Sequence, residues 1–328
     1  MKICIIKLGA KGDVIRTIPV VKSIKEKYKG AEITWITKLN IKDILQTYNF
    51  INQIETIPFQ TAETFDILYN FDIEPEATSL SSSISATKKL GFFQEDNFSK
   101  AFNLGAEYYL NTLFDDEIKK SNRKTYQQMM FEAAEIPYNN ELIPLQLSEQ
   151  LNQYANNFLK QNNLSTEKLI GINLGASPRW PSKSWHKDNL KELIKKLKSL
   201  NYQIILFGGP DELDKLKPIA KELNVLTNNP NNTNLEFASL INKCKTIICS
   251  DSFALHVSLA LKKPTIGLFF VTSPHEVEPY NLLTKITSPF LKDFFPEKSD
   301  LYDDELVKSI SADKVLREIE KINNSINY

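Results

Sequence analysis

The chain has 328 residues, and its forty lysines and arginines balance forty aspartates and glutamates, so that the net charge is zero. This balance leaves no global field that would draw the chain to nucleic acid or to a membrane surface. No stretch approaches the roughly 20 consecutive apolar residues of a membrane span, and the length favours two domains of about 150 residues each.

Cysteine and histidine usage bears on metal sites and on location. The three cysteines, Cys4, Cys244 and Cys249, lie in or beside apolar runs without the spacing of metal ligands, which indicates buried thiols in a reducing compartment. The three histidines are too widely spread for a zinc cluster, so we expect neither a metal nor a cofactor. Because an apolar strand begins directly at the N-terminus, we expect no secretory signal. These features predict a cytoplasmic protein, for which peripheral contact with the inner membrane surface stays open.

The N-terminal stretch combines a strand, a turn and a helix. Residues 3–8 form an apolar run rich in β-branched side chains, which predicts a buried strand. Gly9 and Gly12 permit a turn with positive φ or a close backbone approach. Asp13 then opens an amphipathic helix, where its carboxylate is either a helix cap or a reagent for a ligand at the end of the strand. The apolar face of this helix consists of Val14, Ile18, Val21 and Ile24.

Strand and helix patterns alternate through the rest of the first half. This alternation indicates a parallel sheet built from βα units. A serine-rich segment at residues 80–85 is too short to separate domains, so we assign residues 1–150 to one N-terminal domain. The predicted strands lie at residues 31–37 and 65–71, with an apolar segment at 54–57 and helices near 41–48 and 122–136.

A second βα series follows a polar connecting helix that ends near residue 166. It predicts another Rossmann-like domain over residues 151–310 and a last helix over residues 311–328. We expect that last helix to pack back on the N-terminal domain. The predicted strands of this series lie at residues 168–174, 203–207, 246–249 and 265–269, and its helices include 187–200 and 252–261.

Polar residues follow three strands of this second series. Ser177, Arg179 and Lys183 lie after the first strand, where a hydroxyl and two cations suit anion capture, although an ordinary solvated loop has the same composition. Glu212 follows a Gly-Gly turn, where it either binds vicinal hydroxyls or favours the dipole of a helix. Beyond the strand at residues 246–249, two potential helix caps and a histidine on an apolar helix complete the set: Asp251, Ser252 and His256.

These motifs together resemble glycosyltransferase family 9, the bacterial heptosyltransferases. The family opens with Leu-Gly-x-x-Gly-Asp-Val and then Thr-x-Pro, which are residues 8–14 and 17–19 here. The resemblance implies that Asp13 is the general base. It further implies that Ser177 and Lys183 hold the phosphates of the donor and that Glu212 binds its ribose. Asp251, Ser252 and His256 match the family's pyrophosphate-binding signature, and Trp185 matches a packing position.

The chain departs from the family pattern at a few positions. Phe253 and Ala254 replace the glycine and proline of the pyrophosphate signature, and Phe270 replaces another glycine. A phenylalanine side chain can block the approach of backbone to phosphate. We therefore expect the two rings to form an atypical wall of the donor pocket. Leu174 stands where the family prefers proline.

The family resemblance implies an α/β fold of the GT-B type, with two Rossmann-like domains that face each other across a cleft. It implies an inverting, metal-independent transfer of a sugar, heptose from ADP-heptose, to a saccharide or lipid-linked acceptor in cell-surface glycan assembly. The first domain would bind the acceptor, where Lys7, Lys11 and Arg16 flank the Asp13 turn and could meet phosphates. A solvated helix face is the alternative interpretation of these three cations.

Two other functions fit the same architecture. A nucleotide-sugar 2-epimerase shares the two-domain arrangement, and a non-catalytic nucleotide-sugar-binding protein would explain Phe253 and Phe270. Asp13 separates these hypotheses, because a binding protein has no need of a carboxylate at the cleft.

Overall fold

The computed structural model describes residues 1–175 and 179–326. The chain packs into two compact units. The first comprises Met1–Gln146 together with His275–Glu278, and the second comprises Leu147–Pro274 and the chain from Pro279 onward. Within the first unit, the Tyr138 hydroxyl donates to Glu278 Oε2 at 2.5 Å, which ties the returning segment to that unit.

The first unit is built on a six-stranded sheet with the order β3-β2-β1-β4-β5-β6. All neighbours pair in parallel except β6, which is antiparallel to β5. The chain runs outward from β1 to β3 and then returns to β4 beside β1, so the strand order reverses between β1 and β4. In open α/β sheets such a switch point forms a crevice at the carboxyl ends of the strands. The strands are β1 (Lys2–Ile6), β2 (Glu32–Thr37), β3 (Gln53–Thr56), β4 (Phe65–Asn70), β5 (Ala86–Glu95) and β6 (Phe98–Ala101).

The helices of the first unit confirm some predicted elements and add others. The predicted apolar face of α1 is fully buried. The serine-rich segment lies mostly in α3, and the predicted helix 122–136 is the shorter α6, which packs against α1. The sequence patterns missed β5, β6, α4 and α5. The helices are α1 (Lys11–Lys27), η1 (Leu39–Ile41), α2 (Lys42–Leu45), α3 (Pro75–Ser83), α4 (Leu104–Phe114), α5 (Asp116–Ser121) and α6 (Tyr126–Ala133).

The second unit repeats the strand order of the first. Its sheet runs β12-β11-β10-β7-β8-β9, with every pair parallel, so its switch point lies between β7 and β10. The strands are β7 (Leu169–Asn173), β8 (Gln203–Phe207), β9 (Leu226–Thr227), β10 (Thr246–Ser250), β11 (Thr265–Phe269) and β12 (Leu283–Thr287).

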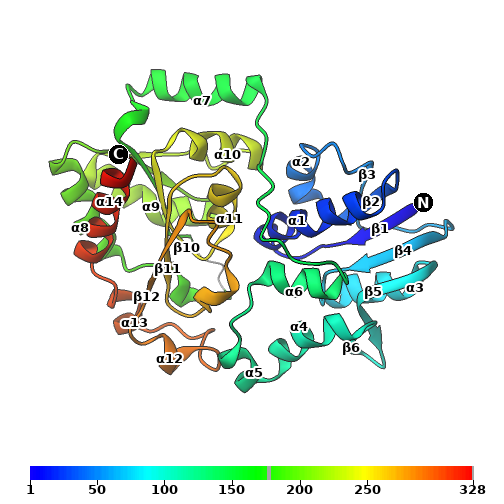
Figure 1. Ribbon diagram of the computed structural model, residues 1–328. Coiled ribbons are helices and arrows are strands. Elements are labelled where there is room, and N and C mark those ends of the chain that lie inside the picture. Colours follow the sequence, from blue (N-terminus) through cyan, green and yellow to red (C-terminus); the bar gives the residue numbers. More distant parts are fainter. Residues whose placement is uncertain (176–178, 327–328) are drawn as a thin grey trace. The chain divides into compact units, whose positions relative to one another are not determined.

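Helices of the second unit form two groups by their contacts. One group contains α8, α9 and α14, and the other contains α7, α10 and α11. Figure 1 shows α14 alongside α8. The helices are α7 (Glu149–Gln161), η2 (Thr166–Lys168), η3 (Pro181–Lys183), α8 (Lys187–Ser199), α9 (Pro210–Leu223), α10 (Asn234–Lys243), α11 (Phe253–Ala260), α12 (Leu291–Phe294), α13 (Asp304–Lys308) and α14 (Ala312–Ile326). The short η4 (Pro274–Glu276) lies where the chain returns to the first unit, which includes His275–Glu278.

The core of the second unit explains where the last helix packs. Leu193 and Leu197 of α8 share one buried cluster with Val315 and Ile319 of α14. Strand residues at alternate positions, including Ile170 and Ile172, complete this cluster from the sheet. The last helix therefore belongs to the core of the second unit, and its packing on the N-terminal domain stays a prediction.

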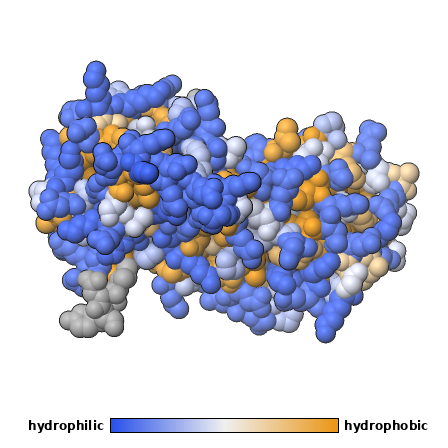
Figure 2. Space-filling view, turned by 90° about the horizontal axis from the view of Figure 1, so that it is seen from above, coloured by the Kyte–Doolittle hydropathy of each residue, from blue (hydrophilic) through white to orange (hydrophobic). Residues whose placement is uncertain are grey.

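The visible surface in Figure 2 is mostly hydrophilic, with apolar side chains in separate areas. Such scattered apolar exposure is normal for a folded protein. Across residues 1–175 and 179–326, no helix combines the length and the apolar character that a membrane crossing requires. The large apolar side chains with the greatest exposure are Leu39, Phe98, Leu104 and Phe114.

Candidate active site

A buried ion pair occupies the switch point of the first unit. Lys7 follows β1 and Asp72 follows β4, and both residues are only 2–3% exposed. The Asp72 Oδ2 atom accepts from the backbone N–H groups of Leu8, at 2.9 Å, and Gly9, at 2.5 Å, and lies 3.6 Å from Lys7 Nζ. Burial alone would lower the pKa of Lys7, but Asp72 and the smaller contributions of Tyr126, Asp13 and Tyr109 together outweigh burial and raise this pKa above its ordinary value. The first turn is therefore anchored by a carboxylate of the same chain.

Glycine is required in this turn for space. A Cβ atom on Gly9 would lie 3.0 Å from Lys7 Nζ and 3.1 Å from Asp72 Oδ2. The ion pair would have to move to accept any side chain there. Gly9 thus serves a close approach, one of the two roles expected from the sequence.

Asp13 lies in the first turn of α1, at the edge of this anchored turn. The helix begins at Lys11, with Ala10 as its N-cap, so Asp13 is not the capping residue. Its side chain is 29% exposed. Arg16 donates to Asp13 Oδ1 from both Nε, at 3.1 Å, and Nη2, at 2.9 Å. The carboxylate is thus accessible to solvent and held by a guanidinium.

The three predicted acceptor-binding cations occupy different environments. Lys7 is buried with Asp72 and donates to the Phe71 carbonyl at 3.0 Å, so its ammonium does not face an acceptor. Arg16 lies on Asp13 and on the ring of Tyr126, at 4.0 Å from the guanidinium carbon to the ring centroid. Lys11 is partly exposed at the start of α1.

The switch point of the second unit brings together several predicted donor-binding residues. Lys183 Nζ donates to Asp251 Oδ2 at 3.2 Å, and His256 Nε2 lies 3.8 Å from Asp251 Oδ1. The Ser252 hydroxyl donates to Asn173 Oδ1 at 3.1 Å, which joins the ends of β10 and β7. Lys183 and Asp251 are partly buried, with side chains 17% and 18% exposed. We call Lys183, Asp251, Ser252 and His256 the strand-end cluster.

Glu212 lies in the first turn of α9, in a space made by three glycines that follow β7 and β8. A Cβ atom on Gly175 would lie 2.7 Å from Glu212 Cγ, one on Gly208 would lie 2.9 Å from Glu212 Cβ, and one on Gly209 would lie 2.9 Å from Glu212 Oε2. All three contacts are closer than real Cβ atoms show. The glycines after β7 and β8 thus permit a carboxylate at the carboxyl edge of the sheet.

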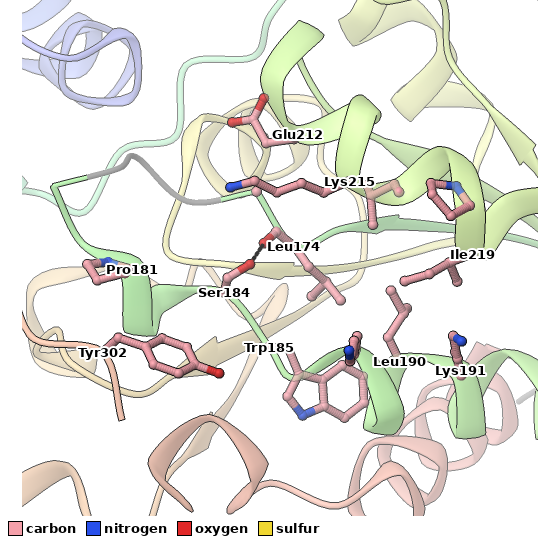
Figure 3. Close-up of a pocket in the computed structure, with 14 residues that line it drawn as sticks. Leu174, Pro181, Ser184, Trp185, Leu190, Lys191, Glu212, Lys215, Ile219 and Tyr302 are labelled. Atoms are coloured by element: carbon pink, nitrogen blue, oxygen red, sulfur yellow. Dashed lines mark hydrogen bonds between the residues drawn. The ribbon is translucent and has the colours of Figure 1, made fainter. Parts of the chain in front are cut away.

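A cavity of about 560 Å³ begins at Glu212 and extends between α8 and α9 (Figure 3). Its lining includes Glu212 and Lys215 at one end and Trp185 and Leu190 at the other, whereas Lys183 and Asp251 are not part of it. The Trp185 indole N–H donates to the Ile310 carbonyl at 2.8 Å, which fits the predicted packing role. The cavity thus includes Glu212 and none of the four residues of the strand-end cluster.

The two phenylalanines that replace family glycines lie in different clusters. The Phe253 ring stacks on Phe237 of α10, with centroids 5.8 Å apart and planes at 28°. Phe270 is 1% exposed and packs in the core cluster with α8, α9 and α14. The expectation that both rings form one wall of the donor pocket is therefore wrong. Ser177, the predicted phosphate-binding hydroxyl, lies outside the described residues.

The cysteines are buried free thiols, as predicted. Burial raises the pKa of Cys244 to about 12, so this thiol is protonated at neutral pH. Within the part of the chain that the structure describes, no three His, Cys, Asp or Glu side chains gather into a potential metal site.

Sequence reasoning missed three residues of these sites. Asp72 is the second residue after β4, and Asn173 ends β7, so the rule that ligands bind at strand ends could have found both. Tyr126, 1% exposed beneath Arg16, carries no such signal, because an aromatic residue at the start of a helix indicates only packing.

Comparisons with known proteins show which class of protein this chain is similar to. The sequence profile of glycosyltransferase family 9 (heptosyltransferase) matches residues 61–293. Lipopolysaccharide core heptosyltransferase OpsX of Haemophilus influenzae is 24% identical over 307 residues, which cover 88% of this chain and 84% of that protein.

Solved structures establish the fold. A family 9 glycosyl transferase from Veillonella parvula superposes with a TM-score of 0.77 at 16% identity, over 99% of this chain and 97% of that chain. The ADP-heptose lipopolysaccharide heptosyltransferase II of E. coli superposes with a TM-score of 0.72 at 20% identity, over 100% of both chains. The fold is α/β, with two Rossmann-like units as in these heptosyltransferase structures.

Proposed function

Because the chain belongs to glycosyltransferase family 9, the heptosyltransferase family, we propose that it transfers heptose from ADP-heptose to a saccharide or lipid-linked acceptor of the cell surface. The observation that carries the proposal is the family match over residues 61–293. The donor is proposed from the E. coli relative, whose description names ADP-heptose. Peripheral contact with the inner membrane at the cytoplasmic face is part of the same proposal, since a lipid-linked acceptor would lie there.

In the proposed reaction Asp13 acts as general base. Its carboxylate accepts the proton of an acceptor hydroxyl while the hydroxyl oxygen attacks the anomeric carbon of the donor. The bond from that carbon to the diphosphate oxygen breaks, and the nucleoside diphosphate leaves with the electron pair. Attack on the face opposite the leaving group inverts the anomeric centre. The position of Asp13 in the first turn of α1, next to the switch point of the first unit and with its side chain partly exposed, supports this role.

In the second unit, the strand-end cluster would hold the diphosphate. Lys183 and the N-terminus of α11 would stabilise the negative charge that develops on the leaving group. Ser177 and His256 would add polar contacts, and Asp251 would hold Lys183 in place until the donor binds, as its 3.2 Å contact suggests. Glu212 would accept hydrogen bonds from the ribose hydroxyls.

Fewer cations are proposed as acceptor contacts than the sequence alone implied. Lys11 stays a candidate contact for an acceptor phosphate, because it is partly exposed at the start of α1. Lys7 is committed to Asp72 and would support the turn instead. Arg16 is considered separately below.

A transfer assay tests the proposed function. The purified protein is incubated with ADP-heptose and deacylated, heptose-free lipopolysaccharide core, and products are identified by mass spectrometry. We expect an acceptor heavier by one heptose, together with stoichiometric ADP. Free nucleotide without a glycosylated product would instead favour an epimerase-like enzyme. Donor binding by calorimetry without turnover across an acceptor panel would favour a binding protein, and either result would overturn the proposal.

Replacing Lys183 by alanine is expected to weaken donor binding by about 10- to 100-fold. The estimate follows from a lost hydrogen bond to a charged group, worth about 1.5–3 kcal/mol. Calorimetric titration with ADP measures this change. Lys195→Ala is the matched control, because Lys195 is an exposed lysine of α8 in the same unit. Equal ADP affinity in Lys183→Ala and in the unmodified protein would remove Lys183 from the donor site.

A further inference from the structure

Arg16 contacts Asp13 through two hydrogen bonds to one carboxylate oxygen. Both its Nε and its Nη2 donate to the same oxygen, Asp13 Oδ1, at 3.1 Å and 2.9 Å. The Arg16 side chain is 15% exposed, and the pair is three residues apart on α1. Two donors that converge on one carboxylate oxygen fix the rotation of the carboxylate, and with it the direction of the second oxygen.

Tyr126 holds the guanidinium from the other side. The Arg16 guanidinium carbon lies 4.0 Å from the centroid of the Tyr126 ring, a distance typical of cation–π contact. The ring itself is 1% exposed and packs edge-on against Tyr109, with centroids 5.7 Å apart and planes at 84°. Arg16 therefore lies between a rigid aromatic face and the carboxylate.

Thr17 links Tyr126 back to the same turn of α1. Its hydroxyl donates to the Asp13 carbonyl at 2.7 Å and lies 3.2 Å from the Tyr126 hydroxyl. The packing of α6 on α1 thus fixes both the backbone and the side chain of Asp13. Burial raises the pKa of Tyr126, so its phenol stays neutral beside the ion pair.

From this geometry we infer that Arg16 is a positioning residue for Asp13, clamped on Tyr126, and not a contact for the acceptor. The inference rests on the proposed function, in which Asp13 is the general base. A base must point at the proton that it removes, and a misplacement of about 1 Å can cost about a hundredfold in rate. A guanidinium that already makes two bonds to Asp13 and lies on an aromatic ring has little freedom to reach a substrate phosphate.

The two roles of Arg16 predict different kinetics. A positioning residue affects the chemical step, so its loss lowers kcat and leaves KM for the acceptor unchanged. An acceptor contact provides binding that is equal in the ground state and the transition state, so its loss raises KM with little change in kcat. An acceptor contact would also weaken as salt is raised.

The test compares Arg16→Met and Arg16→Lys in transfer assays at saturating donor, with the acceptor varied at low and high salt. We expect Arg16→Met to lower kcat by about a hundredfold with acceptor KM within about twofold of normal. Arg16→Lys is expected to recover part of that loss, because an ammonium keeps the charge but lacks the planar fork. Tyr126→Leu, which removes the ring under the guanidinium, is expected to lower kcat in the same direction.

Lys22→Met is the matched control. Lys22 is also a cation of α1 that pairs with an acid of the same helix, Glu26, at 2.9 Å, but far from the turn. It is expected to leave kcat and KM unchanged. ADP affinity and thermal denaturation of each variant establish that it is folded, and Arg16→Lys keeps the test decisive if Arg16→Met does not fold.

An increased acceptor KM with normal kcat, or no kinetic effect in either Arg16 variant, would overturn the inference. Its failure is distinguishable from that of the proposed function. If Asp13→Asn keeps normal turnover, the general-base role itself is wrong. If Asp13→Asn is inactive while Arg16→Met and Arg16→Lys are normal, only the positioning role is wrong. We also expect Arg16→Met to add almost nothing to the loss in Asp13→Asn, since both act on one group.

Discussion

Replacement of Asp13 by asparagine is expected to lower the rate of sugar transfer by about a hundred- to ten-thousand-fold, the range typical for loss of a positioned general base. Asparagine keeps the size of the side chain and removes only the group that accepts the proton. The proposed donor site belongs to the second unit, so ADP affinity is expected to stay normal. Initial rates at saturating donor and acceptor measure the loss, and calorimetry with ADP measures the affinity.

Glu26→Gln is the matched control for this substitution. Glu26 is a carboxylate of the same helix, 54% exposed and paired with Lys22, so its neutralisation changes the charge of α1 by the same amount. We expect it to have no effect on turnover. Near-normal transfer by Asp13→Asn would remove Asp13 from the mechanism.

Replacement of Asp72 by asparagine is expected to destabilise the first unit by about 3–5 kcal/mol, because it leaves the buried Lys7 ammonium without a counter-charge. Aspartate and asparagine are nearly isosteric, so no cavity contributes to the loss of stability. Urea denaturation, followed by hydrogen exchange of peptides from β1 and β4, measures the free energy of unfolding of this unit.

The double variant Lys7→Met/Asp72→Asn separates charge from packing. It leaves no buried charge, so we expect it to be more stable than Asp72→Asn alone. If the double variant is the less stable of the two, the charge explanation is wrong.

The pH dependence of the Lys7–Asp72 pair follows from the raised pKa of Lys7. A pKa raised in the folded state means that the stabilisation is complete below the unfolded value of about 10.4 and is lost as the pH rises through the folded value. Through Lys7, the contribution of the pair to the stability of the unmodified protein is therefore expected to be constant from about pH 6 to about pH 9. The same denaturation series at three pH values checks this.

Hydrophobic pattern was enough to predict the parallel sheets, because buried parallel strands give near-continuous apolar runs. The apolar faces of α1 and α8 were predicted for the same reason, since their buried residues recur at helical spacing. The patterns missed β5, because its two lysines and its final Gln94 and Glu95 leave only the short apolar run Leu90–Phe93 between them. The packing of α14 could not be predicted either, because an amphipathic pattern shows that one face of a helix is buried but not which element covers that face.

The sequence predicts which residues lie together in a site when those residues follow neighbouring strands. It does not predict which side chains pair with each other. Lys183, Asp251 and His256 come together because their elements follow β7 and β10, which are adjacent at the switch point. By contrast, the sequence alone does not distinguish the roles of Lys7 and Arg16, because both are cations close to Asp13 in the chain. Only the three-dimensional packing separates a buried lysine on Asp72 from an arginine on Tyr126.

The repeated strand order has a consequence for stoichiometry. An architecture that occurs twice in one polypeptide offers two locations where a nucleotide could in principle be recognised. In the first unit, the backbone N–H groups of Leu8 and Gly9 lie at the strand end where such an anion would bind, and they already donate to the carboxylate of Asp72. This carboxylate is part of the chain, so it cannot dissociate. Each polypeptide is therefore expected to bind one nucleotide rather than two.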